Sequence, residues 1–80
     1  MINYEEARKN LDSCHCYRAS KGNRSITFFK SKDTPDIYYW YVIHDVPVKI
    51  KDKPIKIKES EIYDSLYLMI SSANDDKDLF

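Results

Sequence analysis

The stretch DIYYWYVIH, from Asp36 to His44, decides how this chain folds. Its β-branched and aromatic residues are typical of a β-strand, whose side chains alternate between the two faces of a sheet. Both alternating sets are apolar or aromatic: Ile37, Tyr39, Tyr41 and Ile43 form one set, and Tyr38, Trp40, Val42 and His44 form the other. The stretch therefore predicts an interior strand with bulky side chains on both faces.

Further strand signals lie on either side of this stretch. The segment SITFFKS, residues 25–31, precedes it across a proline-containing turn, and a shorter strand is expected around Tyr17. After it comes VKIKDKPIKIK, residues 48–58, whose alternating aliphatic and lysine residues predict a hairpin that turns at residues 51–54. The order of these segments predicts an antiparallel meander.

Two helices are expected to flank the strands. Asn3 and Glu6 fit a capping box, so the first helix should begin near Tyr4. Ser60 is expected to cap a second helix. The apolar residues of this helix recur at helical spacing: Ile62, Leu66, Met69, Ile70 and Ala73. We therefore expect an α+β fold with an N-terminal helix, an antiparallel β meander of three to five strands and a C-terminal helix.

Length and composition fit one small folded domain. The chain has 80 residues, of which 42% are hydrophobic and 32% are charged, as in an ordinary globular domain. We expect a single α+β domain over residues 1–73 and a flexible acidic tail over residues 74–80. The N-terminus lacks a signal-peptide pattern and no apolar run is long enough to span a bilayer, so we expect a cytoplasmic protein with no membrane partner.

The charge is zero in total but unevenly distributed. Between residues 18 and 58 there are ten Lys and Arg residues against four Asp and Glu residues, a net charge of +6. Between residues 59 and 80 there are six acidic residues against Lys77, a net charge of −5. Such a division predicts either internal ion pairs or two oppositely charged faces that meet partners.

The lysines of the predicted hairpin need an explanation. If residues 51–54 make the turn, the aliphatic side chains share one face and the lysines share the other, with Lys49 directly opposite Lys56. Like charges opposite each other in an antiparallel pair are destabilising, so folding alone does not favour this arrangement. Two explanations stay open: the lysines protect a sheet edge from aggregation, or they bind an anionic partner.

The placement of the helices decides whether the aromatic rings are exposed. If the helices divide between the two faces of the sheet, the rings are core residues. If both helices cover one face, Tyr and Trp rings lie open beside the lysines, a composition typical of surfaces that bind protein or single-stranded nucleic acid. In the second case we expect the following residues to bind the partner: Tyr38, Trp40, Lys49, Lys51, Lys56, Lys58 and Arg24.

Motifs for catalysis or cofactor binding are scarce. Cys14, His15 and Cys16 are residue types that bind zinc, and His44 would complete a set of four, but the spacing lacks the C-x-x-C turn of structural zinc sites. Gly22 is the only glycine, which argues against a glycine-rich phosphate loop. We therefore expect two reduced thiols, no metal, no cofactor and no enzymatic activity.

The order helix, antiparallel strands, helix resembles the double-stranded RNA-binding domain in outline. That family binds phosphates through a lysine-rich start of its second helix, whereas the corresponding segment here, ESEIYDS, carries Glu59, Glu61 and Asp64. These acids suit the N-terminal end of a helix and repel phosphate, so the function of that family is not carried over. Small phage-encoded inhibitors of host enzymes share the same outline.

Two classes of function remain. The first is a small non-enzymatic protein-binding module, such as a stoichiometric inhibitor or adaptor from a phage or other mobile element that acts on a host protein. The alternative is a small nucleic-acid-binding protein that uses a basic, aromatic sheet face, with Arg18, Lys21 and Arg24 on backbone phosphates. Because the net charge is zero, the sequence favours a protein partner.

Overall fold

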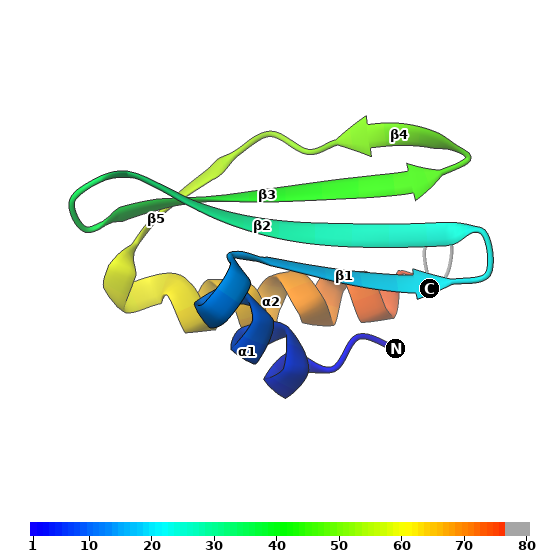
Figure 1. The fold of residues 1–80 in the computed structure, drawn as a ribbon, viewed down its shortest axis with the longest axis horizontal. Helices are drawn as coiled ribbons and strands as arrows, with labels where there is room; N and C mark the ends of the chain where they lie inside the picture. The colour runs from blue at the N-terminus through cyan, green and yellow to red at the C-terminus, as the bar shows by residue number, and fades with distance from the viewer. Residues whose placement is uncertain (77–80) are drawn as a thin grey trace.

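The strands form one antiparallel sheet, and both helices lie on the same side of it (Figure 1). The computed structural model describes residues 1–76. The elements follow in this order: α1 (Tyr4–Cys14), β1 (Cys16–Lys21), β2 (Arg24–Thr34), β3 (Ile37–Val46), β4 (Val48–Lys51), β5 (Ile55–Lys58), the short 3-10 helix η1 (Glu59–Glu61) and α2 (Ile62–Asp75). The α+β class and the five-stranded antiparallel sheet confirm the fold expected from the sequence.

The two helices begin in different ways. Asn3 caps α1 as predicted, since its side-chain oxygen accepts a hydrogen bond of 2.9 Å from the backbone N–H of Glu6. The predicted cap of α2 is wrong, because Ser60 lies inside η1 and α2 starts only at Ile62, without a side-chain cap. The single turn of η1 leads the chain from β5 into α2.

The core lies between the helices and one face of the sheet. Trp40 is fully buried, with 0% of its surface exposed, and it is the largest buried side chain of the described residues. It belongs to one cluster with side chains of both helices and of three strands: Ala7 and Leu11 of α1, Ile26 and Phe28 of β2, Tyr38 and Val42 of β3, Ile57 of β5, and Ile62, Leu66, Ile70 and Ala73 of α2. The buried hydrophobic strand residues all come from one alternating set, so the helices cover one face only.

The lysine-rich segment corrects the predicted hairpin. β4 and β5 do not pair with each other; they follow one another along the same edge of β3, and residues 52–54 interrupt the edge between them. Lys49 therefore lies opposite Asp45, and Lys56 lies opposite Tyr39. The predicted opposition of two lysines is wrong. β3 is long enough to pair with both short strands, and the alternation of side chains is the same in either arrangement.

The C-terminal boundary also differs from the prediction. α2 continues through Asp75, so Asn74 belongs to the helix rather than to a tail. The Asn74 side chain accepts a hydrogen bond of 2.7 Å from the backbone N–H of Ile2 and donates one of 3.0 Å to the Ile2 carbonyl. The domain therefore includes Asn74. Residues 77–80 of the predicted tail lie outside the described part of the chain.

Candidate partner-binding face

The face of the sheet that the helices leave uncovered is the candidate functional site, and we call it the open face. Cα partners across a sheet point their side chains to the same side, so the register assigns its residues. It comprises Cys16, Arg18 and Ser20 of β1; Ser25, Thr27, Phe29, Ser31 and Thr34 of β2; Ile37, Tyr39, Tyr41, Ile43 and Asp45 of β3; Lys49 and Lys51 of β4; and Lys56 and Lys58 of β5. Polar and aromatic side chains are mixed on it.

All four predicted lysines of β4 and β5 stand on the open face, along one border. On β3, Lys49 lies opposite Asp45 and Lys51 opposite Ile43. Lys56 lies opposite Tyr39 and Lys58 opposite Ile37. All four are exposed, and within residues 1–76 none of them forms an ion pair with a carboxylate. The Lys51 ammonium lies 4.9 Å from the centre of the Tyr41 ring, a cation–π distance. This border thus carries positive charge that the described residues leave uncompensated.

The aromatic residues predicted for this surface require a correction. Tyr38 and Trp40 point to the helices and are buried, with 9% and 0% of their surfaces exposed. They are core residues and are not available to a partner. The rings on the open face are instead Tyr39 and Tyr41, which are partly exposed, and Phe29, which is 36% exposed.

The arginines are separate from the four lysines. Arg24 is exposed at the start of β2, and its register partner Lys21 shares its side of the sheet, which is the helix side. Arg18 does lie on the open face, where it donates a hydrogen bond of 3.2 Å to the Ser25 hydroxyl. That hydroxyl in turn donates a bond of 2.8 Å to Asp45. The Asp45 carboxylate is therefore engaged within the sheet.

A hollow opens on this face beside the interruption of the edge. It measures about 430 Å³, and its walls include Cys16, Phe29, Tyr41, Ile43 and Lys51. The register explains why it is open. β4 pairs with residues 43–46 and β5 with residues 37–40, so no residue of either strand stands opposite Tyr41. The Lys51 side chain reaches over the ring from the neighbouring row.

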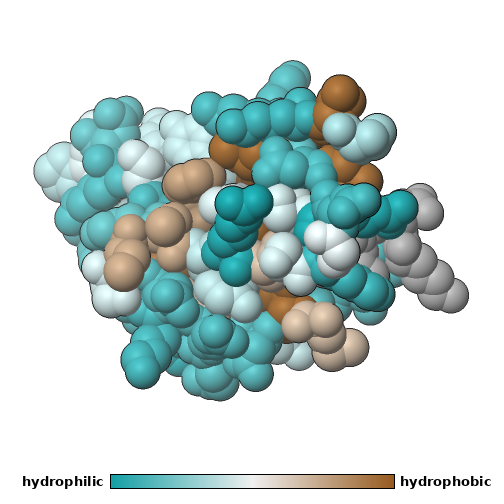
Figure 2. All heavy atoms as spheres, turned by 45° about the vertical axis from the view of Figure 1, so that its right-hand side comes forward, coloured by the Kyte–Doolittle hydropathy of each residue, from teal (hydrophilic) through white to brown (hydrophobic). Residues whose placement is uncertain are grey.

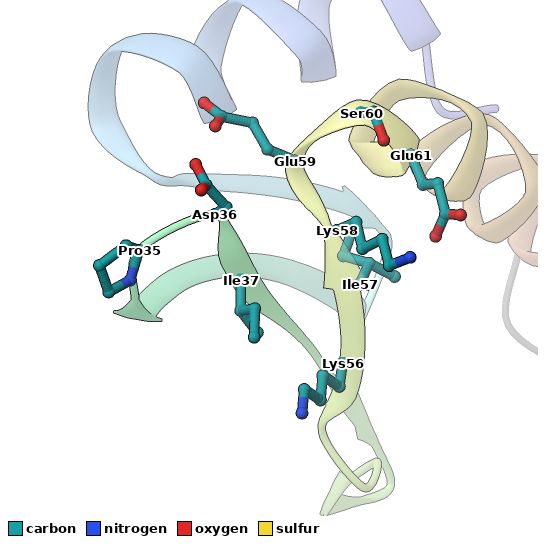
Figure 3. A pocket seen from close by; sticks show the side chains of 9 residues that line it. All are labelled: Pro35, Asp36, Ile37, Lys56, Ile57, Lys58, Glu59, Ser60 and Glu61. Atoms are coloured by element: carbon teal, nitrogen blue, oxygen red, sulfur yellow. The ribbon is translucent and has the colours of Figure 1, made fainter.

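Two other hollows differ in chemistry. One of about 900 Å³ lies where β5 leaves the sheet (Figure 3), and acids share its lining with lysines: Asp36, Glu59 and Glu61 with Lys56 and Lys58. Another of about 420 Å³ lies on the helix side, between α2 and the interrupted edge, and includes Lys53. The exposed aliphatic side chains of β4 are on the helix side too, and Figure 2 shows hydrophobic atoms gathered at the upper right, where β4 lies.

The cysteine and histidine residues considered as zinc ligands do not come together in the described residues. Cys14 and Cys16 are free and exposed on either side of His15, which has a left-handed φ of 62°. His44 points to the helix side, with its Nε2 atom 3.1 Å from Asp52. Within residues 1–76 there is no group of three or more His, Cys, Asp or Glu side chains that could hold a metal ion.

Comparison with known proteins adds no relative. No protein-family model, no curated protein and no solved structure matches the chain. Within the described residues, no helix has the length and apolar character needed to cross a membrane.

Sequence reasoning missed Phe29, Tyr39, Tyr41 and Ile43 as site residues, although it separated the two faces of the central strand correctly. The useful signal was in the neighbouring strand. In residues 25–31, the set that contains Phe29 is otherwise Ser and Thr, whereas the set that contains Ile26 and Phe28 is bulky. A Ser- and Thr-rich set is typical of the exposed side of a sheet.

Proposed function

We propose that this protein is a small non-enzymatic binding module that engages an acidic surface of a protein partner through its open face. One observation carries the proposal: partly exposed rings lie beside four lysines that form no ion pair within the described residues. Aromatic side chains in the middle of a surface, with charges at its border, are typical of protein interfaces. A stoichiometric inhibitor or an adaptor, as found in phages and mobile elements, is a form such a module takes.

The distribution of charge supports a protein partner. No Lys or Arg occurs between Glu59 and Asp76, a segment with five acidic residues that covers η1 and α2 on the helix side. The basic border of the open face and this acidic segment lie on different sides of the sheet, in a chain whose net charge is zero. Electrostatic complementarity on one face steers an acidic partner and sets its orientation.

Single-stranded nucleic acid is the second candidate. Rings that stack with bases beside lysines that contact phosphates are the features that such binding requires, and Tyr39, Tyr41 and Phe29 lie within reach of the lysine border. The zero net charge makes this alternative weaker, because dedicated nucleic-acid binders tend to be basic.

A capture experiment tests the proposal. The immobilised chain, the double variant Lys51→Glu with Lys56→Glu and the control Lys53→Glu are incubated with lysate from the source organism, with and without nuclease. Lys53→Glu makes one such charge reversal on the helix side. We expect a protein that the wild type and the control retain and the double variant loses. Equal retention by all three chains, or loss after nuclease treatment, contradicts the proposal.

A further inference from the structure

The hollow beside Tyr41 permits a more specific statement about the partner, which rests on the proposed function. Residues of two neighbouring rows of the sheet form most of its wall: Cys16, Phe29 and Tyr41 form one row, and Ile43 with Lys51 belongs to the next. Lys30 and Ser31 of β2 and the end of α1 at Cys14 and His15 complete the lining. Its lining is thus largely apolar or aromatic. A volume of about 430 Å³ lies within the range of pockets that take up one compact organic group.

The interruption at residues 52–54 keeps this hollow open. The backbone N–H of Asp52 donates a 2.9 Å hydrogen bond to the Val42 carbonyl, and the chain then leaves the edge until Ile55. A continuous edge strand would place a further side chain against Tyr41. Because that position is vacant, the ring and its neighbours form a recess rather than a continuous layer of side chains.

Positive charge lies on one side of the recess, along the border of the sheet formed by β4 and β5. Lys51 forms part of its wall, and Lys49 and Lys56 stand on the same face on either side of the interruption. The open-face carboxylate Asp45 accepts a hydrogen bond from Ser25 and forms no ion pair with these lysines. A ligand that fills the recess therefore meets an apolar floor and a cationic rim on the side of β4 and β5.

We infer that the recess takes a bulky apolar or aromatic side chain of the partner, from a segment in which carboxylates flank that side chain and reach the lysines. The partner contributes an acidic peptide segment with one apolar anchor. A buried anchor in a pocket with charges at its border is the arrangement in which few residues supply most of the binding energy. A single recess suits one anchor, whereas a nucleic-acid strand needs successive stacking rings.

The test titrates the isotope-labelled full chain, followed by NMR, with two blocked peptides. Both carry the same aspartates; one has a central phenylalanine and the other a central alanine. We expect the phenylalanine peptide to bind about tenfold more tightly, as burial of one aromatic side chain implies. The largest shifts should fall on Cys16, Phe29, Tyr41, Ile43 and Lys51.

Variants separate the anchor from the charge. Tyr41→Ala should remove the preference for phenylalanine, with Tyr67→Ala, at an exposed tyrosine of α2, as the control that keeps it. Lys51→Glu should weaken the binding of both peptides, and Lys53→Glu should weaken the binding of neither.

If both peptides bind equally and Lys51→Glu weakens the binding of both, the inferred apolar anchor is wrong, while the acidic partner of the proposed function stands. If neither peptide binds and oligothymidylate shifts the open-face amides instead, both are wrong. If no probe binds, the inference is overturned.

Discussion

At the scale of single residues, two adjacent rings of β3 have different tasks. Trp40 lies in the core cluster together with side chains of both helices, whereas Tyr41 lies on the open face beside Lys51. Neighbouring positions of a strand point to opposite faces, so one sequence step separates a core residue from a candidate contact residue. Substitutions at the two positions should therefore affect different properties.

We expect Trp40→Ala to lower the free energy of unfolding by about 3–5 kcal/mol, the usual cost of removing a buried aromatic side chain. Tyr41→Ala should lower it by less than about 1 kcal/mol, since its ring is only partly buried and a surface substitution is mild. Chemical denaturation followed by circular dichroism measures both. A Tyr41→Ala loss as large as that of Trp40→Ala would show that the open face is itself a core.

The partners of the lysines give a second prediction. Lys49 lies opposite Asp45, so Lys49→Glu places two carboxylates opposite each other and should cost about 0.2–1 kcal/mol. Lys56 lies opposite Tyr39, so Lys56→Glu should change stability by less than about 0.5 kcal/mol. Thermal melts of the two variants compare them directly. Stabilisation by Lys56→Glu, as a lysine hairpin would give, contradicts the edge arrangement described here.

At the scale of elements, the positions of the helices and strands were predictable from the sequence, but the pairing register between the strands was not. The apolar spacing of residues 62–73 and the Asn3 cap are local signals, and both are confirmed. Which face of β3 the helices cover depends on pairing with β2. That register shifts by one residue between Lys32 and Thr34.

This shift explains why the site could not be assigned from the sequence. Pairs counted from the turn, starting at Thr34 and Ile37, would place Phe28 opposite Ile43. In the structure Phe28 lies opposite Val42, because β2 contains an extra residue near the turn. A slip of one residue exchanges the two faces of a strand, so Tyr38 and Trp40 exchange places with Tyr39 and Tyr41 as surface candidates.

The end of α2 gives a prediction at the same scale. Asn74 joins the last turn of the helix to Ile2 through two hydrogen bonds. Asn74→Ala leaves the Ile2 backbone groups without this partner and should cost about 1–3 kcal/mol. A thermal melt measures the loss, and Ser72→Ala, an exposed position of the same helix, is the control. Equal melting temperatures for the two variants would show that the bonds to Ile2 contribute nothing.

At the scale of the whole molecule, a basic border and an acidic segment lie on different sides of the sheet. Lysines border the open face of the sheet, and the segment from Glu59 to Asp76 on the helix side is acidic. The interrupted edge has two consequences, because it both disrupts an aggregation-prone border and leaves the Tyr41 recess open. Lysines that only protect the edge from aggregation need no complementary partner. Binding data therefore distinguish edge protection from partner binding.

Salt dependence provides a prediction at this scale. Ions screen charges at the surface over about 8 Å at physiological ionic strength, so partner affinity should fall as salt rises from low to physiological concentration. For a protein partner with an apolar anchor the decrease should be modest, whereas contacts to many phosphates make affinity fall by several orders of magnitude. Calorimetry across a salt series measures the slope, and an affinity independent of salt contradicts a role for the lysines.

The most direct test is the affinity of the captured partner for the open-face variants, measured by calorimetry at one low and one physiological salt concentration. We predict that Lys51→Glu combined with Lys56→Glu weakens binding at least about tenfold, a change of about 1.4 kcal/mol, while Lys53→Glu binds like the wild type and all three chains melt at similar temperatures. Undiminished affinity of the double variant, with its fold intact, would contradict the assignment of this face to the partner.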